Sequence, residues 1–296
     1  MGKGSSDAIR NGFTFFFSKR KRLFRHKYKY IKRWYLFYNE SNIIGQQVVD
    51  QLEMPEKFAL VPWRTHIVIF TKCKSVEEAL FYVDKTIEGN WSRAVLEQQI
   101  KSDLYARQGC ALTNFSQTLP ESQMQKAREV LKDPYCFDFL TMRPEYEEKD
   151  IEDALISNIT KFLLELGKGF AFVGRQMELR MPDGNSYFPD LVFYHIPLKS
   201  YVVIDLKAVD FKPEFVVKIN FYVSAVDHLM KGDGDNDTIG LIICKTSDKT
   251  TVEWSFNGVN RPLGVATYEL KEVVERTVAE MDARNSKEND EVKGLL

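Results

Sequence analysis

The chain has 296 residues, of which 44% are hydrophobic and 28% are charged, so it is a globular protein long enough for two modest domains. Its four cysteines and four histidines are scattered and form no C-x-x-C pair, which argues against a zinc site and a disulfide framework. It contains no apolar run near the roughly 20 residues of a membrane span and no cleavable signal pattern, so we expect a cytoplasmic protein with no membrane partner.

The net charge of −1 conceals a strongly basic beginning. The first 40 residues contain 11 Lys and Arg against 2 acidic residues, a balance of +9, so the remainder carries −10. Basic and aromatic side chains alternate over residues 19–33, which is the composition of a phosphate-binding surface. We expect the densest group to bind nucleic-acid backbone: Lys19, Arg20, Lys21 and Arg22. The alternative is that this run is only a solvated basic face.

The N-terminal half is predicted to be mostly helical. Apolar residues recur near helical spacing over residues 75–87, and further helices are expected over residues 93–106 and 119–131. The aromatic segment at residues 34–38 is predicted to be the core-facing part of another helix. We therefore assign residues 1–131 to a helical, basic-headed domain that binds nucleic acid, and residues 132–147 to a connecting segment.

Residues 148–270 are expected to form the second domain, with an α/β fold. An amphipathic helix is predicted over residues 148–166, because its apolar stripe has helical spacing and Gly167 follows it as a helix-ending residue. Residues 169–181 are predicted to supply a strand. Residues 271–296 alternate in charge and are expected to be a charged helix or tail.

The centre of this domain is predicted to be an antiparallel hairpin. The runs at residues 191–194 and 201–206 are rich in β-branched and aromatic residues, and a turn sequence separates them. Pro213 indicates the start of a helix that extends to about residue 230, and residues 238–245 predict a buried strand. The expected order is thus helix, three strands, helix and strand.

Two aspartates and a lysine lie at the ends of the hairpin strands. Asp190 precedes the first strand, and Asp205 and Lys207 end the second, where residues two apart point to the same face. Two carboxylates and an ammonium group would suit a hard divalent cation and the water that it activates. The alternative is a solvated strand end beside a turn aspartate.

Glu152 is a further candidate for this site. It heads the helix face that packs on the sheet, where a carboxylate is costly unless it is paired or binds a cation. Glu148 lies four residues earlier, and for it we favour the ordinary role of a first-turn glutamate stabilised by the helix dipole.

This order of elements, with Pro189-Asp190 and Asp205-Leu206-Lys207, resembles the PD-(D/E)xK nuclease superfamily and, within it, the bacterial YhcG-type family. In the C-terminal half the resemblance rests on FLLELGKGFAFVGRQ (162–176), PDLVFYH (189–195), VVIDLK (202–207) and FKPEFVVKINFY (211–222). In the N-terminal half it rests on KRWYLFYNE (32–40), LVPWRTHI (60–67) and FYVDKTIEGNWSRAVLEQQI (81–100). One departure is Lys218, where the family usually has glutamine.

The resemblance implies a restriction-endonuclease-like core with a mixed sheet and a DNA-cleaving enzyme, with an endonuclease favoured over an exonuclease. It implies Mg²⁺, with Mn²⁺ as a substitute, bound by Glu152, Asp190 and Asp205. Lys207 would be the catalytic lysine, while Gln176 and Lys218 would contact the substrate. Two alternatives remain open, namely an RNA-directed nuclease and a non-catalytic DNA-binding or assembly module, and a homodimer is a candidate assembly.

Overall fold

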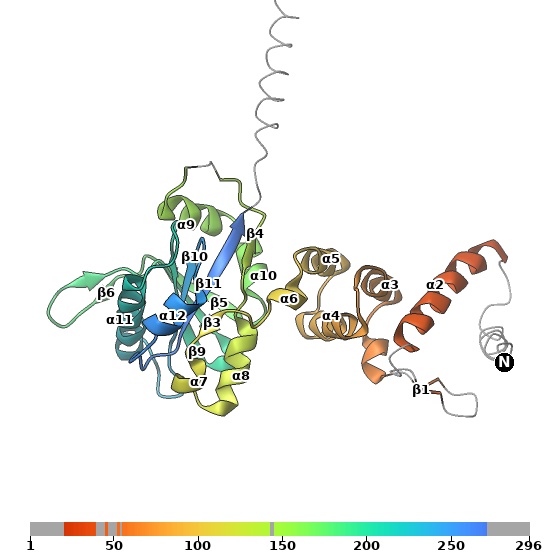
Figure 1. The fold of residues 1–296 in the computed structure, drawn as a ribbon, viewed down its shortest axis with the longest axis horizontal. Helices are drawn as coiled ribbons and strands as arrows, with labels where there is room; N and C mark the ends of the chain where they lie inside the picture. The colour runs from red at the N-terminus through yellow and green to blue at the C-terminus, as the bar shows by residue number, and fades with distance from the viewer. Residues whose placement is uncertain (1–20, 40–44, 47–51, 54, 143–144, 271–296) are drawn as a thin grey trace, which may run out of the picture. The chain divides into compact units, whose positions relative to one another are not determined.

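The computed structural model describes residues 21–39, 45–46, 52–53, 55–142 and 145–270. The chain divides into two compact units, Met1–Tyr105 and Ala106–Leu296, each with its own hydrophobic core. Figure 1 shows helices in the first unit and a sheet flanked by helices in the second. Among the described residues, no helix combines the length and the apolar character that crossing a bilayer requires.

The first unit is helical, as predicted, and its core is largely aromatic. Trp34 and Tyr38 are buried on one helix and pack edge-to-face with each other and near Phe58, which confirms the core-facing segment. Its helices are α2 (Lys21–Asn39), the short 3₁₀ helix η1 (Glu56–Leu60), α3 (Trp63–Lys72), α4 (Val76–Gly89) and α5 (Arg93–Lys101), and α6 (Leu104–Arg107) spans the division. A small hairpin joins β1 (Gly45–Gln46) to β2 (Leu52–Glu53).

The helix α3 was not predicted from the sequence. Pro62 lies at its N-cap position, directly before the first helical residue. The prediction for α5 was right at its start, where the Ser92 hydroxyl accepts a hydrogen bond from the Val95 N–H, and too long at its end. The chain leaves the helical conformation at Asp103, whose φ is +51°.

The second unit contains a mixed sheet of seven strands in the order β3-β11-β10-β9-β8-β5, with β4 beside β11. The strands are β3 (Leu112–Thr113), β4 (Tyr135–Phe137), β5 (Phe170–Arg175), β8 (Leu191–His195), β9 (Ser200–Leu206), β10 (Ile239–Cys244) and β11 (Leu263–Leu270). β9, β10 and β11 are mutually parallel, whereas β8 and β5 are antiparallel to their neighbours. The predicted α/β fold, the mixed sheet, the hairpin β8–β9 and the buried strand β10 are confirmed.

The helices of this unit differ from the prediction. The expected helix over residues 148–166 is two helices that meet at Asn158, whose side-chain amide donates to the carbonyl of Ala154. The helices are α7 (Phe115–Thr118), α8 (Glu121–Val130), α9 (Glu148–Ser157), α10 (Ile159–Leu166), α11 (Glu214–Leu229) and α12 (Lys249–Ser255). The expected strand over residues 169–181 is also divided, since β5 ends at Arg175 and a separate hairpin, β6 (Leu179–Arg180) and β7 (Ser186–Tyr187), follows.

Alternate side chains of β9 face two different helical layers. Val202, Ile204 and Leu206 belong to the core that contains α9 and α10. Val203 belongs to the core on the other face, which α11 covers. Because side chains alternate along a strand, Asp205 points to the α11 side of the sheet, where it contacts Lys218. This alternation determines which charged residues can meet at the end of β9.

Residues 132–147, expected to connect two domains, begin as part of the sheet. β4 pairs in parallel with β11, and its Tyr135 and Phe137 are fully buried. β3 pairs with β11 as well, so the chain enters the second unit long before residue 131. The structure therefore corrects the predicted boundary from residue 131 to residue 105. The physical reason is strand pairing across more than 100 residues of sequence, which no local pattern reports.

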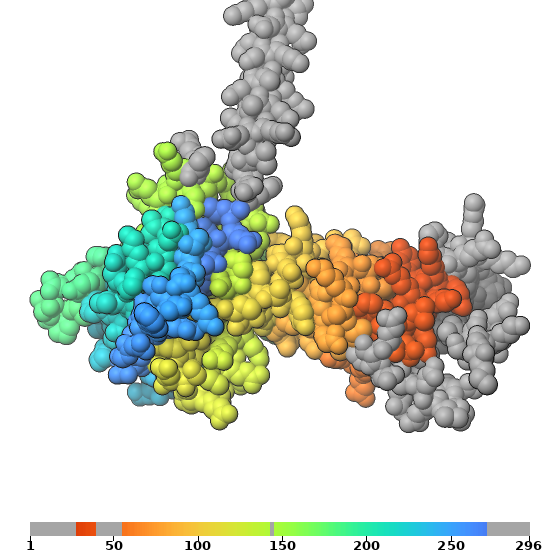
Figure 2. Space-filling view, in the orientation of Figure 1, coloured from red at the N-terminus to blue at the C-terminus, as the bar shows by residue number. Residues whose placement is uncertain are grey.

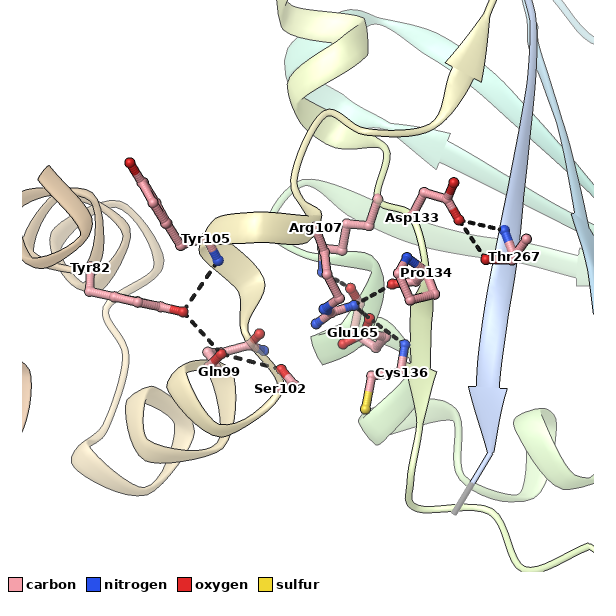
Figure 3. Close-up of polar contacts among 11 residues, drawn as sticks. Tyr82, Gln99, Ser102, Tyr105, Arg107, Asp133, Pro134, Cys136, Glu165 and Thr267 are labelled. Atoms are coloured by element: carbon pink, nitrogen blue, oxygen red, sulfur yellow. Dashed lines mark hydrogen bonds and ion pairs between the residues drawn. The ribbon is translucent and has the colours of Figure 1, made fainter. Parts of the chain in front are cut away.

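A buried ion pair fixes the start of the second unit (Figure 3). The guanidinium of Arg107 donates to Glu165 Oε1 and to the carbonyl of Pro134, both at 2.7 Å. The backbone N–H of Cys136 donates to the same carboxylate oxygen at 2.9 Å. The two charged side chains are only 7% and 6% exposed, so α6, β4 and α10 are joined through one satisfied carboxylate.

Candidate active site

Asp190 and Asp205 lie opposite each other at the end of the β8–β9 hairpin. Leu191 pairs with Ile204 in the antiparallel register, and extending that register by one residue places the two aspartates across from each other. The N–H of Leu206 donates to Asp190 Oδ2 at 2.9 Å, which fixes this carboxylate against the neighbouring strand. The structure therefore brings together the two aspartates that the sequence pattern singled out.

The carboxylate of Asp205 is completely buried between two ammonium groups. Its Oδ2 lies 2.8 Å from Lys207 Nζ, and its Oδ1 lies 2.9 Å from Lys218 Nζ. Both contacts are ion pairs at hydrogen-bonding distance, so two cations balance the buried charge of Asp205.

Asp190 has an unusual acidity for a carboxyl group. Burial and the nearby charge of Asp205 together raise its pKa from 3.8 to about 6, although the hydrogen bond from Leu206 opposes the rise. Two like charges held close in a buried place repel each other, so this pair favours either a proton or a cation.

Lys207 is buried with its ammonium at the centre of the site. Besides Asp205, its Nζ contacts Glu148 Oε2 at 3.1 Å and the carbonyl of Leu206 at 2.8 Å. It also lies 5.3 Å from the centre of the Phe215 ring. Glu148 thus reaches the site, although the sequence analysis favoured an ordinary helix-end role for it. Its spacing of four residues from Glu152, on the same helix face, is the signal that could have indicated this.

Lys218 faces the site from α11. Its Nζ is 2.9 Å from Asp205 Oδ1 and 5.4 Å from the centre of the Tyr222 ring. Burial lowers its pKa, but the charge of Asp205 and the contact with that carboxylate outweigh burial, so the net shift is upward. The side chain is 42% exposed, so this ammonium group has access to solvent while it contacts the buried carboxylate.

Glu152 is buried on α9, where its carboxylate contacts Arg175 and Gln176. The guanidinium of Arg175 contacts Glu152 Oε1 and also Asp153. The amide of Gln176 donates to Glu152 Oε2 at 2.8 Å and, more weakly, to Asp190 Oδ1 at 3.4 Å. Gln176 is placed by a hydrogen bond from its own N–H to the carbonyl of Asp190 and by a left-handed backbone, with φ +45°.

Within the described ranges, no three His, Cys, Asp or Glu side chains are gathered closely enough to bind a metal ion together. α9 packs on one face of the sheet, while Asp205 points to the α11 face. Glu152 is held by Arg175 and Gln176, and the amide of Gln176 also donates to Asp190. Arg175 is a neighbour of the site that the sequence analysis did not single out.

The predicted phosphate-binding residues of the N-terminus are not described. Lys19 and Arg20 lie outside the described residues, and of Lys21 and Arg22 only the helical backbone of α2 is described. Farther along α2, Lys29, Lys32 and Arg33 are exposed. The role of the basic run therefore stays a prediction.

Known proteins match both parts of this chain. The family model described as the YhcG PDDEXK nuclease domain matches residues 128–283, and the one described as the DUF1016 N-terminal domain matches residues 11–107. The Escherichia coli (strain K12) protein named "Putative nuclease YhcG" is 30% identical over 221 residues, which are 73% of this chain and 58% of that protein. This chain thus spans somewhat more than half the length of that relative.

Among solved structures, a repair endonuclease from Pyrococcus abyssi matches with a TM-score of 0.28 and 14% identity, covering 44% of this chain and 49% of that one. That likeness is too distant to carry an argument. The nuclease-domain model, in contrast, takes in more than half of the chain and includes every strand from β4 to β11. The chain belongs to the family defined by the YhcG PDDEXK nuclease domain, with a DUF1016 N-terminal domain ahead of it.

Proposed function

We propose that this protein is a Mg²⁺-dependent nuclease that hydrolyses phosphodiester bonds within DNA. The observation that carries the proposal is the Asp205 carboxylate, which is fully buried, lies across from Asp190 and is flanked by the ammonium groups of Lys207 and Lys218. A carboxylate pair of this kind is costly to the fold, so a functional reason for it is favoured. Membership in a nuclease family supports the same conclusion.

The residues present fit a hard divalent cation. Asp190 and Asp205 offer carboxylate oxygens, and the carbonyl of Leu206 adds a second type of oxygen ligand. Glu152 would join them after releasing Arg175. When bound there, Mg²⁺ would supply Lewis-acid activation of a water molecule and neutralise charge on the phosphate.

The lysines would act on the substrate directly. Lys207, held by Glu148 and the carbonyl of Leu206, would orient the attacking water and stabilise negative charge that develops on the phosphate oxygens. Lys218 has access to solvent and would attract the phosphate group to the carboxylates. Gln176 would keep Asp190 oriented through its two amide contacts.

The test is a cleavage assay in which Mg²⁺ is titrated against supercoiled, linear and branched DNA, with RNA in parallel. Cleavage of DNA that EDTA abolishes and Mn²⁺ partly restores is the expected result. Conversion of supercoiled circles to nicked or linear forms would identify an endonuclease. Cleavage of RNA alone would favour the RNA-directed alternative, and binding without cleavage would favour the non-catalytic one.

The basic N-terminus is proposed to bind nucleic-acid backbone separately from the chemistry. Changing Lys19, Arg20, Lys21 and Arg22 to Gln should flatten the slope of log affinity against log salt by up to about 4 units, since each phosphate contact on duplex DNA contributes about −0.9. Affinity should fall equally for unrelated sequences, because phosphate contacts carry no base information. An unchanged slope would show that the run is merely solvated.

A further inference from the structure

Two aromatic rings are paired on the surface beside the candidate active site. Tyr187 ends β7, and Phe221 lies on α11; their ring centres are 4.6 Å apart with an interplanar angle of 61°. Both side chains remain well exposed, at 39% and 37%. Phe188 and Val217 add further exposed apolar surface from the same two segments, at 46% and 73%. Exposed apolar residues that adjoin one another in this way indicate a binding surface.

The β6–β7 hairpin that carries Tyr187 projects from the second unit beside α11 (Figures 1 and 2). Its base is anchored, because Leu179 pairs with Tyr187 across the hairpin and is buried in the core that α11 covers. The pair of rings is therefore held by a fixed base and a regular helix, although the rings themselves face solvent. A preformed surface of this kind loses little entropy when it binds a flat partner.

The rings are connected to the carboxylates by two short paths. Phe188 is separated from Asp190 only by Pro189, and the Tyr222 hydroxyl donates to the Phe188 carbonyl at 3.1 Å. On α11, Phe221 follows Lys218 by three residues and therefore lies on the same side of the helix. The ammonium of Lys218 contacts Asp205, so the aromatic pair adjoins the charged site.

We infer that Tyr187 and Phe221 form a stacking surface for an unpaired base next to the phosphate at Asp190 and Asp205. The inference rests on the proposed function and deepens it by naming the class of substrate. The lysines beside the rings suit the phosphates of a nucleic-acid strand, while the rings suit the flat face of a base. Because a base inside a duplex is already stacked on both sides, the preferred substrate is a single strand, or a duplex with frayed or branched ends.

The test measures the affinity of the full-length protein for a single-stranded DNA oligonucleotide of mixed sequence in EDTA, which prevents Mg²⁺-dependent cleavage. Tyr187→Leu and Phe221→Leu remove the rings but keep apolar side chains, whereas Tyr187→Phe keeps the ring. Trp254→Leu is the matched control, since Trp254 is 73% exposed on α12. Each protein is also measured with oligonucleotides in which a single abasic position is moved along the strand. Fully paired DNA provides the comparison.

Each Leu variant should bind the single strand about 5-fold to about 150-fold more weakly, the range that base–aromatic stacking contributes. Tyr187→Phe and Trp254→Leu should bind like wild type. At one position the abasic substitution should weaken wild type and have no further effect on the Leu variants, since both changes remove the same contact. Wild type should bind the single strand more tightly than fully paired DNA.

The inference would be overturned if wild type and the Leu variants bound with equal affinity. It would also be overturned if the effects of the Leu substitutions and of the abasic substitution on affinity were additive at every position. A lack of binding to single strands by wild type would overturn it as well. A separate cleavage assay with Mg²⁺ keeps this apart from the proposed function. If wild type cleaves DNA but the Leu substitutions and the abasic positions act independently, only the stacking surface is refuted. If wild type does not cleave, the nuclease proposal is refuted whatever the binding shows.

Discussion

Glu165 and Asp205 are buried carboxylates of the second unit whose surroundings differ. Glu165 accepts hydrogen bonds from the Arg107 guanidinium and the Cys136 N–H, so its charge is paired and its Oε1 is satisfied (Figure 3). Asp205 lies within 2.9 Å of two ammonium groups, and a second carboxylate, Asp190, adds repulsion. Both are almost inaccessible to solvent.

We therefore expect the ion pair of Glu165 to stabilise the fold and the repulsion between Asp205 and Asp190 to destabilise it. Removing one partner of a satisfied buried pair leaves an uncompensated charge and destabilises the protein. Removing a carboxylate that is held near another of the same charge relieves repulsion instead. Glu165 and Asp205 should therefore respond in opposite ways to substitution, and the four predictions below test this contrast.

The largest effect is expected for Asp205→Asn. Cleavage should fall by ~10³-fold or more, the scale of losing a central catalytic group, while the melting temperature in EDTA stays level or rises. Asp183→Asn, which changes an exposed aspartate in the β6–β7 turn, is the control and should retain activity. Full activity of Asp205→Asn would show that Asp205 has no catalytic role.

Next in size is the loss of the structural ion pair. Glu165→Ala should lower the free energy of unfolding by about 3–5 kcal/mol, because the buried Arg107 is left without its carboxylate. The measurement is urea denaturation, with activity expressed per folded molecule. That activity should remain close to wild type, which is the reverse of the result for Asp205→Asn. An unchanged free energy of unfolding for Glu165→Ala would contradict the expected contrast between the two carboxylates.

The pKa of Asp190 predicts a dependence of stability on pH. Burial and the charge of Asp205 raise this pKa to about 6, so the protonated form favours folding and ionisation above that pH costs stability. The stability of Asp190→Asn relative to wild type in EDTA should therefore increase between about pH 4 and about pH 7, by up to about 3 kcal/mol. Asp183, whose pKa is lowered by a hydrogen bond from the Asn185 backbone, should show no such increase when changed to Asn. A difference in stability between Asp190→Asn and wild type that stayed constant with pH would contradict the repulsion between the buried carboxylates.

The smallest effect is expected for Lys218→Gln, which places the family's usual residue here. Loss of the ammonium should raise KM about 5-fold with little change in kcat, because Lys218 is partly exposed and its proposed role is in substrate binding. Lys212→Gln, at an exposed position before α11, provides the comparison. Unchanged kinetic constants for Lys218→Gln would mean that its contact with Asp205 has no part in binding the substrate.

Local patterns predicted much of this fold because they act over a few residues. Runs rich in β-branched and aromatic residues located β8 and β9, a short apolar run between turn signals located β10, and Pro213 located the start of α11. Local patterns failed where the secondary structure depends on contacts that they do not report. Residues 112–113 and 135–137 form strands only because β11 pairs with them, and the side-chain amide of Asn158 divides a helix whose apolar stripe continues.

At the candidate site, Asp190, Asp205 and Lys207 could be predicted from the sequence to meet, because a short hairpin and its period of two place them together. The face of the sheet that they share could not be predicted, because it depends on how the helices pack on the sheet. The tertiary structure brought Lys218 and the Tyr187–Phe221 pair to the site from α11 and the β6–β7 hairpin, and it turned Glu152 toward Arg175 and Gln176. The packing of helices on opposite faces of a sheet depends on contacts between residues far apart in the chain, and no local pattern encodes it.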